Sequence, residues 1–392
     1  MDLEKLRILG ESAKYDICAS SSCRISGNID IFRQNSPVDR IGNLATGGIC
    51  HSYTPDGRCV SLFKVLLSNY CEKNCLYCPN RKDSGVRRAK FGKDELARIF
   101  IDLYSGNFVE GLFLSSAVHC SVDHAMTEML DVCTIVRTRY RFTGYIHLKI
   151  LPGVSDAHVE SAMKIATRVS LNLEAPNADY LKVIAPEKDF HGEIISRLEA
   201  INRNIQNGNR PNAGYTTQLI VGAAGEGDRD IMRTVGYLYR KKNLRRAYFS
   251  AFIPQSGTPF AGNSEIPLTR ENRLYQADWL LRFYDFDVKD LPFGPDGNLP
   301  LDKDPKRAWA EAHPELFPIE INRVSYDELL RVPGIGQISA RRIVTARHEC
   351  RITDVAMLKR MGVVLKNALP FILIDGKSRL PRADTVQRTL FA

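Results

Sequence analysis

The chain has 392 residues, 44% of them hydrophobic and 25% charged, which is typical of a soluble globular protein with two or three domains. It has no run of eighteen apolar residues and does not begin like a signal peptide, so we expect a cytoplasmic protein without a membrane partner. Ten cysteines in a reducing compartment indicate metal ligation or burial rather than disulfides. The net charge is +9, and the last seventy residues carry thirteen Lys and Arg against six Asp and Glu. This imbalance favours a polyanionic partner.

Residues 1–58 are predicted to form an N-terminal extension, in which cysteines stand among Ser and Gly. Four cysteines lie upstream of the motif described below, namely Cys18, Cys23, Cys50 and Cys59. They are enough for an auxiliary Fe–S cluster or a zinc ion. Their loose spacing fits buried residues, or residues at a substrate mouth, equally well.

From residue 59 to residue 284, short apolar runs rich in β-formers alternate with amphipathic patterns. The predicted strands are 60–67, 109–114, 145–150, 169–173, 216–221 and 247–252. The predicted helices are 93–104, 126–139, 156–167, 194–206, 228–241 and 270–283. Six β-then-α units in series predict an α/β fold with parallel strands joined by crossover helices, two units short of a closed TIM barrel.

Three cysteines, Cys71, Cys75 and Cys78, follow the first predicted strand with C-x3-C-x2-C spacing. Three thiolates on one tight loop can ligate three irons of a [4Fe-4S] cube and leave the fourth iron open. The alternatives are buried structural thiols or a zinc site, which requires a fourth ligand at comparable spacing.

This spacing, with Tyr77 just before the last cysteine, resembles the signature of the radical S-adenosylmethionine (radical SAM) superfamily. The resemblance implies a partial (βα)6 barrel, with the methionine group of SAM on the open iron and Tyr77 on the adenine. It also implies an electron donor such as flavodoxin or ferredoxin, whose electron cleaves SAM to a 5′-deoxyadenosyl radical.

Polar residues near the ends of the other strands are further candidates, because barrel chemistry sits at the C-terminal ends of strands. Ser115 and Ser116 stand where the superfamily binds the methionine amino group, although a hydroxyl-capped loop explains them equally well. The third strand offers His147 and Lys149, of which Lys149 is the catalytic candidate. The remaining cofactor-binding candidates are Asn172, Glu174, Gln218 and Ile253, with Glu226 a doubtful addition. For each polar residue, a satisfied interior side chain is the alternative.

Residues 285–322, rich in Pro, Asp and Gly, are predicted to be a linker packed on the barrel. Residues 323–376 then carry a second motif, in which Ser325 and Glu328 form a capping box and Pro333-Gly334-Ile335-Gly336 turns the chain into a second helix. The motif resembles the helix-hairpin-helix element of DNA repair proteins. The resemblance implies that the backbone of this turn grips a DNA phosphate, with Arg341 and Arg342 beside it. A helical hairpin for protein contact is the alternative.

Residues 377–392 form a basic tail that ends in Gln387-Arg-Thr-Leu390-Phe391. This pattern resembles the short peptide that bacterial DNA polymerases and repair proteins insert into the replication sliding clamp. Gln387, Leu390 and Phe391 would then be partner-binding residues. Docking of the two apolar residues on the protein's own barrel is the alternative.

Over nearly its whole length the chain resembles a family described as DNA modification or repair radical SAM proteins, which tend to occur with a uracil-DNA-glycosylase-like partner. The resemblance rests on the cysteine loop, the Gly-Gly-Ile-Cys-His-Ser segment, the Phe-Leu-Ser-Ser stretch and the terminal hairpin. It implies an enzyme that modifies or repairs a DNA nucleotide through the 5′-deoxyadenosyl radical. The alternatives are an RNA-modifying radical SAM methylthiotransferase or methyltransferase, and a DNA-bound Fe–S sensor.

Overall fold

The computed structural model describes residues 2–13, 49–53 and 59–379 of the chain. The chain divides into two compact units, Met1–Tyr275 and Gln276–Ala392, and each unit is described by itself. Within the described ranges, no helix combines the length and the apolar character that a bilayer crossing requires.

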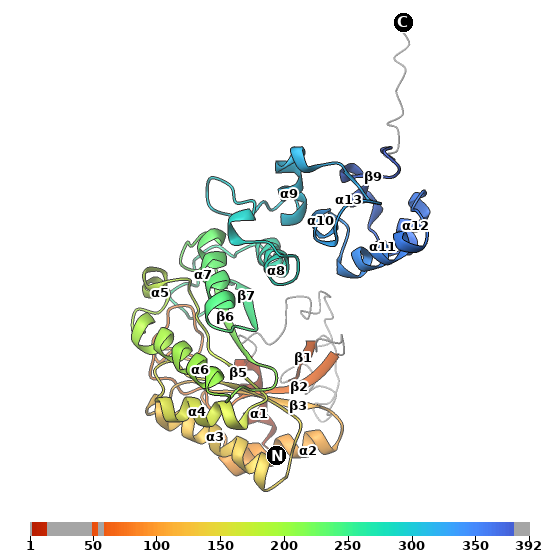
Figure 1. The fold of residues 1–392 in the computed structure, drawn as a ribbon. Helices are drawn as coiled ribbons and strands as arrows, with labels where there is room; N and C mark the ends of the chain where they lie inside the picture. Colours follow the sequence, from red (N-terminus) through yellow and green to blue (C-terminus); the bar gives the residue numbers. More distant parts are fainter. Residues whose placement is uncertain (1, 14–48, 54–58, 380–392) are drawn as a thin grey trace, which may run out of the picture. The chain divides into compact units, whose positions relative to one another are not determined.

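The first unit is built on a seven-stranded sheet in which the strands follow one another in chain order. The strands are β1 (Ile49–Tyr53), β2 (Cys59–Leu66), β3 (Gly111–Ser115), β4 (Tyr145–Lys149), β5 (Arg168–Ser170), β6 (Tyr215–Val221) and β7 (Arg246–Ala251). β1 is antiparallel to β2, whereas β2 to β7 are all parallel. These six parallel strands curl into a half-barrel (Figure 1), which confirms the predicted partial (βα)6 architecture.

Crossover helices connect the parallel strands. The helices of this unit are α1 (Leu3–Ser12), α2 (Lys93–Ser105), α3 (Val122–Thr138), α4 (Asp156–Ile165), α5 (Ala178–Ile184), a π-helix (Phe190–Ile195), α6 (Ser196–Gln206), α7 (Asp228–Lys241) and α8 (Leu268–Phe283), whose last turns fall in the second unit. Successive strand residues such as Leu112, Phe113 and Leu114 are all buried, as expected for parallel strands covered by helices. The sequence patterns predicted the helices α2, α3, α4, α6, α7 and α8. They did not predict the helices α1 and α5, the π-helix or the strand β1.

The second unit is mainly helical. Its elements are a 3-10 turn (Val288–Asp290), α9 (Pro305–Ala312), a 3-10 turn (Pro314–Leu316), β8 (Ile319–Glu320), α10 (Tyr326–Arg331), α11 (Gln337–Glu349), α12 (Val355–Arg360), α13 (Leu365–Ala368), a 3-10 turn (Leu369–Phe371) and β9 (Ile372–Leu373). The predicted capping box begins α10, since Ser325 Oγ accepts from the Glu328 amide at 3.2 Å and Glu328 Oε2 accepts from the Ser325 amide at 2.7 Å.

Aromatic rings join the predicted linker to the rest of this unit. The Trp309 ring lies 5.2 Å from Phe286 and 6.1 Å from Phe317, and Phe317 lies 5.3 Å from Phe371. Residues 285–322 therefore contribute to the core of the C-terminal unit. Their predicted packing on the barrel stays a prediction.

Candidate active site

The cysteine loop leaves β2 at the C-terminal edge of the parallel strands. Cys75 is buried, and its carbonyl accepts from the Cys78 amide at 3.1 Å, which closes a tight turn between the two ligands. Burial, followed by the negative charges of Cys75 and Cys71, raises the pKa of the Cys78 thiol to about 12. The three predicted ligands are therefore close enough to interact electrostatically.

The spacing of the three sulfur atoms suits a cluster better than a single metal ion. Three thiolates on one zinc ion at about 2.3 Å would lie roughly 3.8 Å apart. Among the described residues, only His119, His124 and Glu128 place three ligand atoms all within 4.8 Å of one another, so at least one pair of the three cysteine sulfurs is more than 4.8 Å apart. The residues present thus fit a [4Fe-4S] cube ligated at three corners.

Arg88 organises the backbone of the cysteine loop. Its guanidinium donates to the carbonyl oxygen of Asn69 before the first cysteine, and to that of Asn80 after the last cysteine at 2.9 Å. It also donates to the carbonyl oxygens of Arg81 and Ser84. The loop is therefore closed by hydrogen bonds within the protein.

The loop is also fixed to the segments that follow neighbouring strands. The Glu72 amide donates to the Val118 carbonyl at 2.7 Å, beyond the end of β3. The Leu76 amide donates to the Ile184 carbonyl at 2.8 Å, at the end of α5. These bonds hold the cysteines over the C-terminal edge of the sheet, the edge at which barrel enzymes bind their substrates.

A buried ion pair lies against the loop. Lys188 Nζ is 2.8 Å from both carboxylate oxygens of Glu174, and both side chains are nearly inaccessible to solvent. Although burial opposes the charge of Lys188, the negative Cys75 and Glu174 raise its pKa. The Tyr77 hydroxyl bonds to Glu174, and burial, followed by the negative Glu174, raises the Tyr77 pKa. Glu174 itself has a φ of 66°, an unusual conformation for a non-glycine residue that often marks a functional site.

A small cavity collects several of the other predicted residues. Its volume is about 10 Å³, room for a single water-sized group, and its lining comes from β3 to β7. The lining residues are Phe113, Lys149, Ser170, Asn172, Thr216, Thr217, Gln218 and Tyr248. Lys149, Asn172 and Gln218 therefore line one cavity inside the half-barrel, and their roles stay predictions.

Two predicted residues are engaged elsewhere. The Ser116 hydroxyl donates to the Ala117 carbonyl at 2.9 Å, as expected for a hydroxyl-capped loop. Glu226 accepts from the Gly222 and Ala224 amides, so it closes its own turn after β6. Ser115 ends β3 and is buried, whereas Ile253 follows β7 and is half-buried.

Sequence reasoning missed Lys188, Arg88 and a side-chain cluster after β3. In that cluster, Glu128 on α3 contacts the buried His119, and its other carboxylate oxygen accepts from Lys90 at 2.8 Å. His124 lies 3.7 Å from the same carboxylate. The His-x3-Glu spacing was visible in the sequence, but His124 lies before the predicted helix 126–139, and the approach of the pair to His119 requires the fold.

The C-terminal turn is more enclosed than its motif implies. Pro333 and Ile335 are buried, and Gly334 has a φ of 80° and packs against the chain at Val364. The Ile335 carbonyl accepts from the buried Lys306 at 2.6 Å, and burial lowers the pKa of that amine to about 7. Gly336, the residue before α11, has more space.

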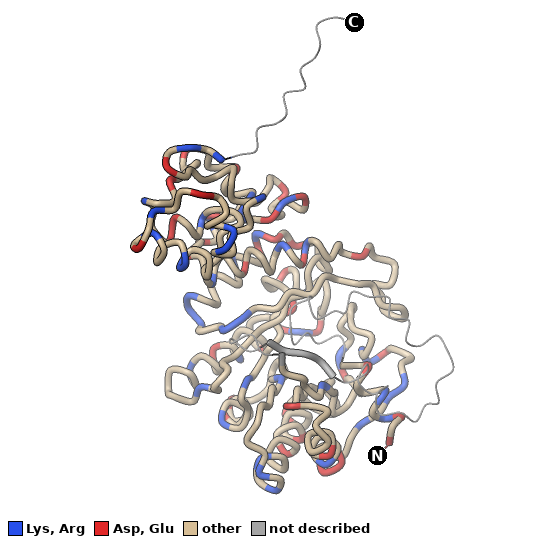
Figure 2. The backbone as a smooth tube through the Cα atoms, turned by 90° about the vertical axis from the view of Figure 1, so that its right-hand side faces the viewer, with Lys and Arg blue, Asp and Glu red and all other residues tan. Residues whose placement is uncertain are grey.

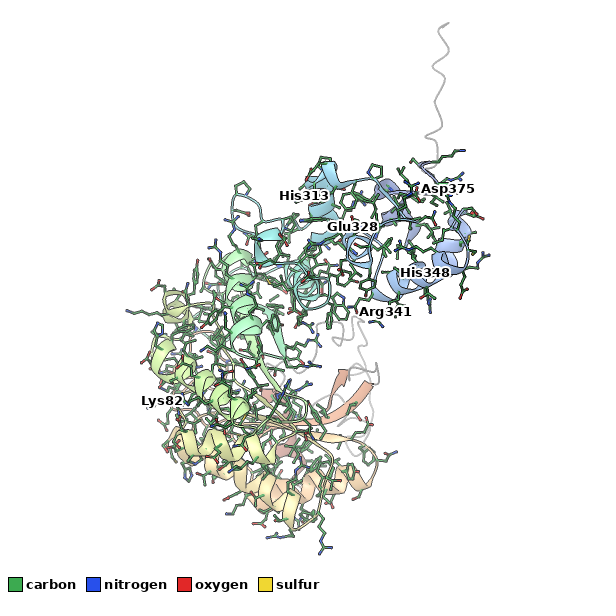
Figure 3. All side chains as sticks on the ribbon, viewed as in Figure 1. Lys82, His313, Glu328, Arg341, His348 and Asp375 are labelled. Atoms are coloured by element: carbon green, nitrogen blue, oxygen red, sulfur yellow. The ribbon has the colours of Figure 1, made fainter. Side chains whose placement is uncertain are left out.

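The predicted arginines border a groove beside this turn. Its volume is about 420 Å³, and it is lined by Arg341, Arg342, Thr345, Ala346, Glu349, Met357, Arg360 and Met361. Arg341 lies on α11, on the same helix as His348 (Figure 3). In this unit Lys and Arg positions alternate with Asp and Glu positions along the backbone (Figure 2), and DNA binding at the groove stays a prediction.

Gly334→Ala is expected to destabilise the C-terminal unit by roughly 2–4 kcal/mol, because a Cβ there would stand 2.5 Å from the Val364 carbonyl oxygen in a left-handed backbone. Gly336→Ala is the matched control, since its Cβ would meet only the Tyr284 hydroxyl at 3.4 Å. Urea unfolding measures both changes. Equal stability of the two variants would contradict the packing described for Gly334.

Five of the remaining predicted residues lie outside the described residues. These are Cys18 and Cys23, and the tail residues Gln387, Leu390 and Phe391. Cys50 and Cys59 lie in the paired strands β1 and β2. The auxiliary metal site and the clamp-binding tail therefore stay predictions.

Comparison with known proteins agrees with the cysteine loop and the half-barrel. The model of the "Radical SAM superfamily" matches residues 65–238. A tRNA-2-methylthio-N(6)-dimethylallyladenosine synthase of Halalkalibacterium halodurans is 26% identical over 202 residues, which cover 49% of this chain and 35% of that relative. A threonylcarbamoyladenosine tRNA methylthiotransferase of Thermotoga maritima is 26% identical over 206 residues, which cover 50% of this chain and 44% of that relative.

Solved structures resemble the chain more loosely. The FeFe-hydrogenase maturase HydG of Carboxydothermus hydrogenoformans aligns with a TM-score of 0.44 and 15% identity, over 55% of this chain and 50% of that chain. A radical SAM methyltransferase of Sphaerobacter thermophilus aligns with a TM-score of 0.42 and 14% identity, over 59% of this chain and 70% of that chain.

The matched relatives are named as tRNA-modifying proteins, and the chain spans less than half of their length. The narrower resemblance to DNA modification proteins therefore stays a prediction. The family match implies a [4Fe-4S] cluster and SAM as cofactors, and the three loop cysteines suit that cluster. Residues 65–238, less than half of the chain, thus match the model of the radical SAM superfamily.

Proposed function

We propose that this chain reductively cleaves SAM and modifies a nucleotide within a nucleic acid. The observation that carries the proposal is the preformed loop of Cys71, Cys75 and Cys78 at the C-terminal edge of a half-barrel with a polar interior. When bound, the cluster and SAM supply a one-electron cleavage that yields a 5′-deoxyadenosyl radical.

The chain's own residues hold the cluster, shape the loop and bind the substrate. The three cysteines hold the cluster, and the Glu174–Lys188 pair, bonded to Tyr77, keeps one side of the loop rigid and free of water. Lys149 and the cavity residues around it face the interior of the half-barrel, where they can bind polar groups of SAM or the substrate. The burial of this site protects a reactive radical from solvent.

We take RNA as the substrate class. The matched relatives are named as tRNA methylthiotransferases or as synthases of a methylthio-adenosine in tRNA, so they favour RNA modification over the DNA reaction that the motif resemblance implied. The family model matches residues 65–238 of this chain and does not extend to the helices α10 and α11. A methylthio or methyl transfer to RNA is the specific reaction that the relatives suggest.

DNA is the second candidate because of the C-terminal unit. Its groove, with Arg341, Arg342 and Arg360 in the lining, offers the positive charge that binds phosphates without regard to sequence. The proposed partners of this reading are duplex DNA, a uracil-DNA-glycosylase-like protein and, through the tail, the sliding clamp. Either reading requires an electron donor such as flavodoxin or ferredoxin.

The test is an anaerobic incubation of the reconstituted protein with SAM and a reductant, with bulk tRNA or duplex DNA in parallel. The RNA proposal expects 5′-deoxyadenosine release that tRNA stimulates and DNA does not, with a new tRNA nucleoside seen by mass spectrometry. Stimulation by DNA alone would replace it with the DNA candidate. The absence of 5′-deoxyadenosine under all conditions would contradict an enzyme and favour the Fe–S sensor.

A further inference from the structure

A cluster of metal-ligand side chains lies beside the first turns of α3, outside the cysteine loop. His119 Nε2 is 2.5 Å from Glu128 Oε2, and His124 Nε2 is 3.7 Å from the same oxygen. Within the described ranges, these are the residues whose three ligand atoms all lie within 4.8 Å of one another. Two imidazoles and one carboxylate therefore converge on a common point.

The local backbone produces this convergence. His124 and Glu128 stand one helical turn apart on α3, so their side chains project from the same face of the helix. The helix is capped by Ser121, whose hydroxyl accepts from the His124 amide at 3.1 Å. Just before it, Cys120 has a φ of 60°, a left-handed conformation that turns the chain. This turn brings His119, which is 5% exposed, back to the helix that it precedes.

The hydrogen bonds of His119 show that a cation belongs between its ring and Glu128. The His119 Nδ1 atom lies 3.3 Å from the Ala117 carbonyl oxygen, which can only accept, so Nδ1 carries a hydrogen. Nε2 of the same ring faces an oxygen of the Glu128 carboxylate, which also only accepts when ionised. A proton or a metal ion must therefore lie between the two atoms. A proton accounts for this contact alone, whereas a metal ion also accounts for the approach of His124 to the same oxygen.

The surroundings of the cluster are those of a metal site. Metal-bound histidines commonly donate from their other ring nitrogen to a backbone carbonyl, as His119 does to Ala117. Ligating carboxylates are also held by hydrogen bonds, and Lys90 Nζ is 2.8 Å from both oxygens of Glu128. The rings of His119 and His124 lie 5.6 Å apart and are nearly perpendicular, at 86°. The His124 side chain is 49% exposed, which gives an ion a path from solvent.

We propose that His119, His124 and Glu128 bind a divalent transition-metal ion such as zinc, at a site separate from the [4Fe-4S] cluster and beyond the proposed function. Two imidazoles and one carboxylate are a known zinc ligand set, in which water completes the tetrahedron. Ligand atoms about 2.1 Å from a tetrahedral zinc ion lie roughly 3.4 Å apart. The distance between His124 and Glu128 is already close to this value. The shorter distance between His119 and Glu128 must widen by roughly 1 Å, which a rotation of the partly exposed Glu128 side chain supplies.

The bound ion connects α3 to a segment that supports the cysteine loop. In this segment the Ala117 amide donates to the Ser68 carbonyl at 2.9 Å, before the first cysteine. The Val118 carbonyl accepts from the Glu72 amide at 2.7 Å, after the first cysteine. A metal ion on the adjacent His119 fixes the segment to the helix as well. The role of the ion is therefore structural, and its binding stabilises this part of the barrel unit.

Zinc binding to the full-length protein tests the site, after reconstitution has placed iron on the three loop cysteines. The variants are His124→Ala and Glu128→Ala. The matched control is His158→Ala, because His158 also contacts α3, with its Nε2 atom 2.8 Å from the Thr127 hydroxyl, but lies outside the cluster. Competition with a fluorescent chelator gives the zinc affinity. Both variants are expected to bind zinc at least about a hundredfold more weakly than the wild-type and control proteins, since the loss of a supporting contact alone costs about 10–100-fold.

X-ray absorption at the zinc edge identifies the ligands. Compared with the wild-type protein, His124→Ala is expected to lose nitrogen and oxygen scatterers at about 2.0–2.2 Å and no sulfur at about 2.3 Å, which separates this site from one built of cysteines. Zinc should also raise the melting temperature of the wild-type and control proteins but not that of His124→Ala.

Circular dichroism checks that each variant folds, and the exposed position of His124 makes its variant the least disturbing of the set. Three results would overturn the proposal: a wild-type protein that binds no zinc, unchanged zinc affinity in either folded variant, or a loss of sulfur scatterers in His124→Ala. The contact between His119 and Glu128 would then be an ion pair held by a proton.

Discussion

A Cys75→Ala protein is expected to assemble no [4Fe-4S] cluster and to lose all SAM cleavage. Cys75 is the most buried of the three loop thiols, so no solvent ligand can take its place, and the two remaining cysteines cannot hold a cube at three corners. Iron analysis, the visible absorption of the reconstituted protein and 5′-deoxyadenosine release measure the effect.

The matched control is Cys133→Ala, which removes another buried thiol, from α3, away from the loop. The wild-type and control proteins should bind about four irons per chain, or about eight if the upstream cysteines hold a second cluster. Persistent SAM cleavage by Cys75→Ala would refute the assignment of this loop.

Lys188→Met is expected to lower the free energy of unfolding of the barrel unit by about 3–5 kcal/mol, because it leaves the Glu174 carboxylate buried without its partner. The double variant Glu174→Gln with Lys188→Met should regain much of that loss, since no buried charge remains. Urea unfolding of the wild-type, Glu174→Gln, Lys188→Met and double-variant proteins, all in the cluster-free form, gives the coupling energy.

Lys182→Met is the control for this pair, because Lys182 is an exposed residue of the nearby helix α5. Its expected effect is within about 0.5 kcal/mol. A Lys188→Met protein as stable as this control would show that Glu174 finds water or another donor. The carboxylate would then be accessible, contrary to its buried position in the structure.

The fold was predictable because its signals are local. Each predicted parallel strand is a short apolar run and each crossover helix has an amphipathic period, so the six repeats could be found without tertiary information. The cysteine loop was predictable for the same reason, because all three ligands lie within eight residues of sequence.

The rest of the candidate site depends on contacts between distant segments. Lys188 lies in a polar stretch without a motif, and only the fold brings it to Glu174. Likewise Gly334 and Gly336 look equivalent in the motif, but only Gly334 meets the chain at Val364.

The hydrogen bonds of Arg88 have a consequence for the recovery of the cluster site after exposure to oxygen. Iron–sulfur cubes with an open corner are destroyed by oxygen, and a loop shaped only by its metal would unfold when the iron leaves. Here the carbonyl oxygens of Asn69 and Asn80, on either side of the cysteines, stay bound to one guanidinium. We therefore expect oxidative damage to be reversible, with a new cluster inserted into a loop that has kept its shape.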